Sequence, residues 1–198
     1  MQKVGLTGGI GSGKTFIASI FETLAVPVFY ADSQAHRLMD QDEQLRTQIQ
    51  ELFGKDLYVN GTLKRDALAR IVFHNPLRIK ELNAIVHPAV HKAFEHWCHT
   101  QKQGNAPYVL EEAAILFESG AYQNMDKVVT IAAPESLRIE RVQQRDAITK
   151  EQVAARMNNQ WTEEQRNNQA DFIIQNDGNQ LLLPQIIAID TKLRACYG

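Results

Sequence analysis

Near its N-terminus the chain reads Val4-Gly5-Leu6-Thr7-Gly8-Gly9-Ile10-Gly11-Ser12-Gly13-Lys14-Thr15. It contains the pattern G-x-x-x-x-G-K-[ST], with Gly8, Gly13, Lys14 and Thr15 in the fixed places. The apolar residues before the pattern predict a buried strand, and residues 16–24 after it predict an amphipathic helix. Glycines let such a loop curl so that backbone N–H groups point at phosphate oxygens, and the helix N-terminus adds partial positive charge. The stretch therefore predicts a P-loop, a phosphate-binding loop.

Two side chains of this loop carry chemistry of their own. Lys14 can reach the β- and γ-phosphates of a nucleoside triphosphate, and the Thr15 hydroxyl can ligate Mg²⁺. The alternative to a P-loop is a chance glycine-rich turn before a helix. The strand, loop and helix follow one another in the order that a P-loop requires, which disfavours this alternative. We therefore expect the chain to bind a nucleoside triphosphate with magnesium.

Length and composition indicate a compact globular protein. The 198 residues are 44% hydrophobic, which is enough to bury one core with insertions. A net charge of −2 lacks the excess of positive charge that is typical of proteins that bind nucleic acid or an anionic membrane. Cys98 and Cys196 lack metal-ligand spacing and are typical of buried thiols in a reducing compartment. No apolar run approaches the roughly 20 residues of a membrane span, and the first strand starts too near Met1 for a signal peptide, so we expect a cytoplasmic protein.

Strand-like runs alternate with helical patterns along the chain. Several are continuously apolar, as expected of parallel strands covered on both faces. We predict strands at Lys3–Leu6, Pro27–Tyr30, Tyr108–Glu111, Lys127–Ile131 and Phe172–Ile174. The alternation predicts an α/β protein with a doubly wound, five-stranded parallel sheet.

Two helical insertions separate these strands. The first has no convincing strand, and its predicted helices are Ser33–Met39, Asp42–Phe53, Lys64–Phe73, Pro76–Ile85 and Pro88–Gln101. The second is highly polar. This plan resembles the nucleoside-monophosphate-kinase architecture, in which the first insertion would hold the acceptor and the second would close as a lid. We predict one P-loop kinase domain of residues 1–198, with its core at 1–31, 104–133 and 170–198, an acceptor-binding insertion at 32–103 and a lid at 134–169.

Carboxylates follow two predicted strands at the sheet edge where ligands bind. Asp32 comes directly after the second strand, where it could accept a proton from an attacking hydroxyl as a general base. Its alternative role is the N-cap of the helix that starts near Ser33. Glu111 and Glu112 end the third strand, a position from which a carboxylate supports Mg²⁺. Because neighbouring strand residues face opposite sides, we expect Glu112 alone to serve the metal, with a solvated loop charge as the alternative.

Arginines concentrate in the second insertion. Arg138, Arg141 and Arg145 fall at i, i+3 and i+7 on one predicted helix face, and Arg156 and Arg166 follow. Arginine forks bind phosphate oxygens and stabilise charge on a transferring phosphoryl group. For any single arginine a solvated face is the alternative. As a group, these arginines predict a lid.

His87 precedes Pro88 at the predicted junction of two helices. A histidine in such a place is usually a cap or a hydrogen-bonding core residue. The other histidines form no recognisable ligand set with it, so no transition-metal site is predicted. From the residues alone, a structural role is the better interpretation of His87.

Further motifs recur in a fixed order over nearly the full chain. They are Gly5-Leu6-Thr7-Gly8-Gly9-Ile10-Gly11-Ser12-Gly13-Lys14, Ala31-Asp32, Gly61-Thr62-Leu63-Lys64-Arg65 with Leu68 and Phe73, Leu82-Asn83-Ala84-Ile85-Val86-His87-Pro88, Ile115-Leu116-Phe117-Glu118, Arg141 with Arg145-Asp146, Arg156, Gln160, Ala170-Asp171 and Asn176-Asp177-Gly178. The opening stretch and the L-N-x-I-V-H-P block are each fairly specific, and their joint order is highly specific. The set resembles the dephospho-coenzyme A kinase family, whose members complete coenzyme A synthesis.

The resemblance implies transfer of the γ-phosphoryl group of ATP to the ribose 3′-hydroxyl of dephospho-coenzyme A. We expect a monomer or a small homo-oligomer, a choice that the sequence does not settle. Together with the loop and the strand-end carboxylates, the resemblance implies four sets of residues. The ATP-binding set is Gly8, Gly9, Ile10, Gly11, Ser12, Gly13, Lys14, Thr15, Phe16, Arg141, Arg145 and Asn176. The catalytic set is Asp32 as the base with Lys14 and Arg141. The acceptor set is Asp32, Arg65, His87 and Glu118, and the Mg²⁺ set is Thr15 and Glu112.

The chain departs from the family pattern at three places. Phe16 replaces a second hydroxyl after the lysine, so only Thr15 can serve the metal. Tyr30 stands where many members have an aspartate two residues before the base, which removes a two-carboxylate arrangement. Residues 111–116 replace the usual D-x-P-L-L, so the strand-end carboxylate is a longer glutamate. None of these departures removes an essential group.

Two other classes of protein share parts of this pattern. Another small-molecule or nucleoside monophosphate kinase would have the P-loop and the arginine lid, but not the His87-Pro88 block or the size of the first insertion. A regulatory GTPase would need N-K-x-D and D-x-x-G motifs, and neither string occurs.

Overall fold

The structure is a computed structural model that describes residues 1–72, 75–102 and 106–195. The chain divides into two compact units, one formed by Met1–Tyr30 with Cys98–Gly198 and the other by Ala31–Trp97. Phe73 and Cys196, which the sequence analysis names, lie outside the described residues.

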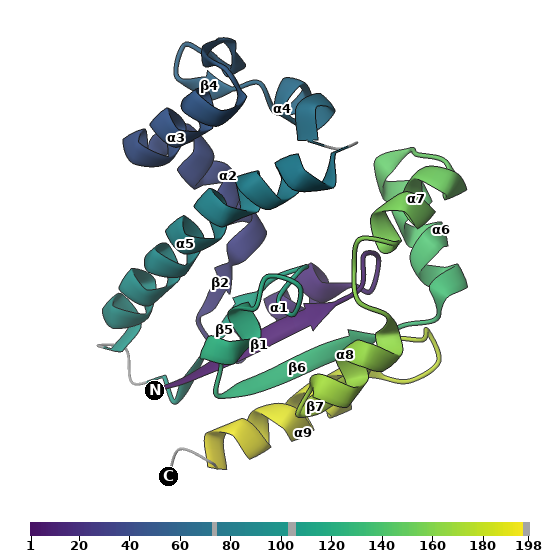
Figure 1. Cartoon of the computed structure of the whole chain (residues 1–198). Coiled ribbons are helices and arrows are strands. Elements are labelled where there is room, and N and C mark those ends of the chain that lie inside the picture. The colour runs from purple at the N-terminus through teal and green to yellow at the C-terminus, as the bar shows by residue number, and fades with distance from the viewer. Residues whose placement is uncertain (73–74, 103–105, 196–198) are drawn as a thin grey trace. The chain divides into compact units, whose positions relative to one another are not determined.

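Strands and helices alternate in the first unit (Figure 1). Its elements are β1 (Gln2–Gly8), α1 (Lys14–Thr23), β2 (Val28–Tyr30), β5 (Tyr108–Glu112), η3 (Ala121–Asn124), β6 (Lys127–Ala132), α6 (Glu135–Asp146), α7 (Lys150–Met157), α8 (Glu163–Gln169), β7 (Phe172–Gln175) and α9 (Leu182–Ala195). The strands form one parallel sheet in the order β2-β5-β1-β6-β7. All five predicted strands are present, and the predicted five-stranded parallel sheet is confirmed.

Helices cover both faces of this sheet, which makes it doubly wound. On one face, Leu6 and Ile131 pack with Ile17 of α1 and Ile186 of α9 in a fully buried core. On the other face, α8 contacts β6, and the side chain of Leu116 packs closely against Gly5. Because the strands are parallel, the carboxyl ends of β1 and β5 meet at one edge, the edge at which open α/β sheets bind ligands.

The second unit is mainly helical. Its elements are α2 (Ala31–Gln41), α3 (Glu43–Phe53), η1 (Lys55–Leu57), β3 (Tyr58–Val59), β4 (Thr62–Leu63), α4 (Arg65–Val72) and α5 (Pro76–Gln101) as far as Trp97. Its core joins these helices through Leu45, Ile49, Leu57, Leu68 and Val86. This unit therefore has a hydrophobic core of its own.

One long helix replaces the two helices predicted around Pro88. α5 runs without a break through Pro88, so the prediction of a helix boundary there was wrong. Proline removes one intrahelical N–H and crowds the preceding turn, which usually kinks or ends a helix. Here Val86, Ala89 and Val90 on both sides of the proline pack against the core of the second unit, and this burial favours the continuous helix.

A small hairpin corrects a second expectation, that no strand lies between Tyr30 and Tyr108. β3 and β4 pair in antiparallel fashion, with Tyr58 opposite Leu63. Asn60 and Gly61 connect them with φ angles of 49° and 82°. Two left-handed residues form the turn that matches the twist of a tight hairpin, and Asn-Gly is the dipeptide that adopts it most readily.

Candidate functional site

The predicted P-loop lies between β1 and α1 in the first unit. Gly11 and Gly13 adopt φ angles of 79° and 92°, which favour glycine. α1 begins at Lys14, and its first bond runs from the Ile17 N–H to the Gly13 carbonyl at 3.1 Å. The N–H groups of residues 14–16 therefore belong to a helical first turn, where no intrahelical acceptor exists. Such a turn is a ready anion-binding site.

The side chains that follow the loop differ in their surroundings. The ammonium group of Lys14 donates to the carbonyl of Gly8 at 3.0 Å and reaches that of Gly9 at 3.5 Å. Thr15 is exposed, and Phe16 is 61% exposed despite its apolar ring. The cation thus lies at the start of the loop, while the Thr15 hydroxyl is accessible from solvent.

Asn176 ties the loop to the first helix of the predicted lid. Its amide nitrogen donates to the Ser12 carbonyl at 2.8 Å, and the residue is 9% exposed. Its side-chain and backbone oxygens accept from the guanidinium of Arg141 at 3.3 Å and 3.4 Å. A residue that follows β7 therefore connects the P-loop with α6 through one amide group.

The arginines predicted to share one helix face have three different environments. Arg138 is buried and its Nε donates to the Ala133 carbonyl at 3.0 Å, whereas Arg141 is half-buried. Arg145 is exposed and pairs with Asp146 at 2.7 Å. Hydrogen bonding to Asp146 raises the pKa of Arg145, and the pKa of the Asp146 carboxyl is lowered in turn. The three side chains lie on one helix but differ in burial and partners, and their role in a lid stays a prediction.

The carboxylates at the end of β5 face opposite sides of the sheet. Glu112 shares a face with Tyr108 and Leu110, which pack against α1, and both Glu111 and Glu112 are 4% exposed. Glu112 lies in register with Tyr30. Burial, a hydrogen bond with Glu22 and the negative charges of Glu22 and Glu112 raise the pKa of Tyr30 to about 12. Glu112 is therefore the glutamate on the face covered by α1.

Gln160 contacts the P-loop, although the predicted site did not include it. Its side-chain oxygen accepts from the Ile10 N–H at 2.8 Å, and its nitrogen donates to the Ala114 carbonyl at 3.1 Å. The next residue, Trp161, stacks on Phe117 at 5.1 Å and donates its N–H to Glu118 Oε1 at 2.6 Å. The only sequence signal for Gln160 was its place among the motifs of the family resemblance.

Three predicted residues lie in the second unit. Asp32 is the exposed second residue of α2, so the alternative role of N-cap was wrong, because the helix begins at Ala31. Arg65 donates to Asp40 at 2.5 Å and to the His36 carbonyl at 3.0 Å. His87 is half-buried within α5, and burial lowers its pKa.

The second unit also contains a cavity of about 530 Å³ between α2, α3 and α5. Apolar side chains such as Leu38, Leu45 and Ile85 line most of it, together with Lys92 and His96. It therefore offers an apolar surface with a few polar groups, as ligand cavities do.

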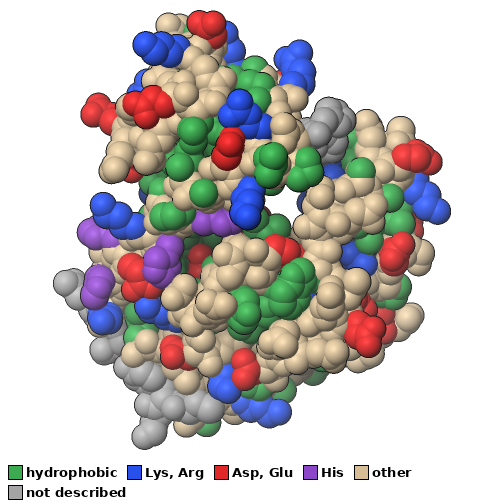
Figure 2. Space-filling view, viewed as in Figure 1, with side chains coloured by type: hydrophobic (Ala, Val, Ile, Leu, Met, Phe, Trp, Pro, Cys, Tyr) green, Lys and Arg blue, Asp and Glu red, His purple; other side chains and the backbone are tan. Residues whose placement is uncertain are grey.

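Charge is mixed on the face shown in Figure 2, where acidic and basic side chains are interspersed. Histidine side chains gather over α5, which carries His87, His91, His96 and His99. Within the described part of the chain, no three His, Cys, Asp or Glu residues come together as a metal site. No described helix is both long and apolar enough to cross a membrane.

Comparison with known proteins gives consistent results. The protein-family profile described as dephospho-CoA kinase matches residues 2–181. A dephospho-CoA kinase of Salinibacter ruber is 41% identical over 179 residues, which cover 90% of each chain. The crystal structure of TT1252 from Thermus thermophilus superposes with a TM-score of 0.82 at 33% identity, covering 100% of this chain and 98% of that one. A dephospho-CoA kinase structure from Campylobacter jejuni gives 0.71 at 29% identity, covering 98% of both.

Proposed function

Because the chain belongs to the dephospho-CoA kinase family, we propose that it transfers the γ-phosphoryl group of ATP to the ribose 3′-hydroxyl of dephospho-CoA. The observation that carries this proposal is the family match over residues 2–181, which contains a P-loop with its lysine at the carbonyls of Gly8 and Gly9. The enzyme is a kinase, and its activity yields coenzyme A and ADP.

The P-loop is proposed to hold the triphosphate. The N–H groups at the start of α1 favour anionic oxygens, and Lys14 can exchange its bonds with two loop carbonyls for bonds with the β- and γ-phosphates. Loop residues Gly8 to Phe16 form the proposed contact set.

Mg²⁺ is proposed to bind at Thr15 and Glu112. Both supply oxygen, which magnesium prefers, and Glu112 lies on the sheet face that α1 covers. The described residues offer no complete set of acidic ligands, so oxygens of the triphosphate and water would complete the coordination. When bound, the ion would neutralise charge on the phosphates.

Arg141 and Arg145 are proposed to contact ATP from the lid, and Asn176 is proposed to contact it from the segment after β7. Asn176 holds Arg141 beside the P-loop through two oxygens, which orients the guanidinium without an acidic partner in the described chain. A guanidinium in that position can stabilise charge that develops on the transferring phosphoryl group.

Asp32, Arg65, His87 and Glu118 are proposed to serve the acceptor. Asp32 is exposed and would take the proton of the ribose 3′-hydroxyl as its oxygen attacks the γ-phosphorus and ADP leaves. Asp40 fixes the side chain of Arg65, and the lowered pKa of His87 favours a neutral imidazole near pH 7. Glu118 has one buried oxygen without a hydrogen-bond partner.

The proposed organisation keeps the sequence-based boundaries, with an acceptor-binding insertion at 32–103 and a lid at 134–169. Its support is that residues 31–97 form a unit with its own core. Cytoplasmic location and a monomeric or small homo-oligomeric state stay predictions.

An ADP-release assay with a panel of acceptors tests this proposal. With ATP and Mg²⁺, dephospho-CoA should support turnover, while nucleosides, nucleoside monophosphates and sugars should not. Lys14→Ala should abolish the signal, and Lys80→Ala, which removes an exposed lysine of α5, should leave it unchanged. Turnover with a nucleoside monophosphate and none with dephospho-CoA would support another small-molecule kinase instead.

A further inference from the structure

Two arginines are buried beside the second glycine of the P-loop. Arg138 on α6 and Arg166 on α8 are only 6% and 2% exposed. A Cβ atom placed on Gly9 would lie 2.4 Å from Arg138 Nη1 and 2.9 Å from Arg166 Nη2. Both guanidinium groups therefore lie against Gly9, so two positive charges are neighbours in the interior of the first unit.

Neither guanidinium has all its hydrogen-bonding capacity satisfied by the protein. Arg138 Nε donates to the Ala133 carbonyl, and Arg166 Nη1 donates to the Trp161 carbonyl. Arg166 Nε is buried with no hydrogen-bond partner. Within the described ranges, no ion pair joins either arginine to a carboxylate. Buried charges in proteins are normally paired, so this arrangement lacks a counter-charge in direct contact.

Two carboxylates act on Arg166 electrostatically, and each has one oxygen that accepts a hydrogen bond from another group. Burial first, and then the charge of Arg138, lower the pKa of Arg166, while Glu118 and Glu163 act in the opposite sense. Glu163 accepts from the Ala133 N–H at 3.0 Å, and Glu118 accepts from the Trp161 N–H at 2.6 Å. These acids moderate the repulsion between the two arginines at longer range, and an anion in direct contact would relieve it further.

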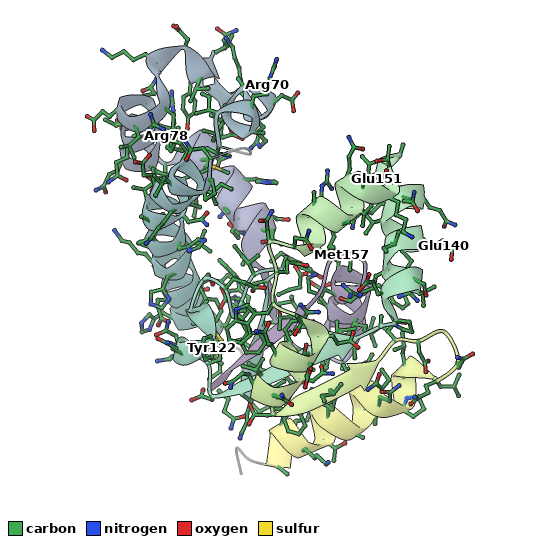
Figure 3. The ribbon with its side chains drawn as sticks, turned by 45° about the vertical axis from the view of Figure 1, so that its right-hand side comes forward. Arg70, Arg78, Tyr122, Glu140, Glu151 and Met157 are labelled. Carbon is green, nitrogen blue, oxygen red and sulfur yellow. The ribbon has the colours of Figure 1, made fainter. Side chains whose placement is uncertain are left out.

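Both arginines line a cavity of about 440 Å³. Met157, labelled in Figure 3 at the end of α7, lines the same cavity, whereas Glu140 and Glu151 point outward from the lid helices. Glu135 and Glu163 are also in its lining. The negative charges of these two glutamates disfavour an anion that fills the cavity. A compact anionic group that contacts only the guanidinium groups of Arg138 and Arg166 fits best.

We propose that Arg138 and Arg166 form a phosphoryl-binding pair at Gly9, in addition to the phosphate contacts of the loop. The inference rests on the proposed function, which supplies the phosphate. Two arginine forks suit the oxygens of one phosphoryl group, and Lys14 donates to carbonyls of the same turn. The γ-phosphate of ATP and a phosphate of the acceptor have the same chemistry, and the experiment distinguishes them.

Equilibrium titrations of Arg138→Gln and Arg166→Gln with Mg-ATP and Mg-ADP, without acceptor, test the pair. If it binds the γ-phosphate, each variant should lose about 10- to 100-fold in ATP affinity, as expected for charge-assisted bonds, while ADP affinity changes little. If it binds a phosphate of the acceptor, ATP affinity should hold and the KM for dephospho-CoA should rise. Arg166→Lys keeps the charge without the fork and should show an intermediate loss.

Arg70→Gln is the matched control, because Arg70 is an exposed arginine of the second unit (Figure 3). Thermal unfolding of every variant separates binding from folding. The inference is wrong if ATP, ADP and acceptor affinities all stay at wild-type values, or if all fall together in proportion to a lower Tm. The nucleotide titrations need no phosphoryl transfer. A wild-type chain that fails to phosphorylate dephospho-CoA would therefore refute the proposed function without deciding the ATP and ADP comparison.

Discussion

Replacing Asn176 with aspartate should loosen the P-loop and weaken ATP binding. The change keeps the shape of the side chain but replaces the amide nitrogen, which donates to the Ser12 carbonyl at 2.8 Å, with an oxygen that cannot donate. The acceptor toward Arg141 remains. The substitution therefore removes the link to the loop while leaving the acceptor for Arg141.

The size of the effect follows from burial. Asn176 is 9% exposed, so water cannot readily replace the lost donor. A buried acceptor left without its hydrogen bond costs about 1–3 kcal/mol. For a chain of this size, about 2 kcal/mol corresponds to a fall in Tm of roughly 4–8 °C. Because Ser12 belongs to the loop, ATP affinity should fall by at least about tenfold, since about 1.4 kcal/mol is one decade in an equilibrium constant.

Differential scanning fluorimetry and an ATP titration measure the two effects. Asn179→Asp is the control, because it makes the same chemical change at an exposed position shortly after Asn176. It should leave Tm and ATP affinity close to wild type. If Asn176→Asp also matches wild type in both measurements, the amide does not support the loop and the reasoning fails.

Three further predictions concern single side chains. Arg141→Ala should lower turnover or ATP affinity with little change in Tm, because the hydrogen bonds of Arg141 in the free protein are long and partly solvated. If the variant instead unfolds, and the fraction that stays folded is fully active, Arg141 has a structural role. Asp32→Asn should reduce turnover by about 10²–10⁴-fold with ATP affinity unchanged, since it removes a proton acceptor from an exposed position; an active variant would direct the search for the base to Glu112. His87 has a lowered pKa in the folded state, so the unfolded chain binds more protons at acidic pH. The free energy of unfolding should therefore fall as the pH drops below the ordinary histidine pKa of about 6.5. Urea unfolding at pH 8 and pH 5.5 should show that His87→Gln loses less free energy of unfolding between the two pH values than wild type does. Equal losses in the two proteins would contradict this.

The sheet was predictable because its central strands, β1, β5 and β6, are mostly buried on both faces and contain apolar runs. The P-loop was predictable because its glycines and lysine have a fixed spacing. The hairpin at Tyr58–Leu63 was missed because each strand has only two residues, although Asn60-Gly61 carried a turn signal that could have indicated it. For Pro88, local preference favoured a boundary, and packing around Val86 and Val90 decided otherwise.

The arrangement of polar groups around the loop was harder to predict. Spacing placed Arg138, Arg141 and Arg145 on one helix face, but it could not show that the first is buried at Gly9, the second bonds Asn176 and the third meets solvent. Gln160 and Asn176 reach the loop from positions far away in sequence, and only the family resemblance pointed to Asn176. Such contacts depend on how strands and helices pack, and a single sequence carries no local pattern for them.

Identification of the phosphorylated product shows whether the protein phosphorylates the ribose 3′-hydroxyl of dephospho-CoA. Wild-type protein and Lys14→Ala are each incubated with ATP, Mg²⁺ and dephospho-CoA, and the product is examined by phosphorus and proton NMR. We expect one new phosphate monoester, coupled to the ribose H3′ proton, in the wild-type reaction and none with Lys14→Ala. A phosphate on another hydroxyl, or ADP released without any phosphorylated acceptor, would contradict it.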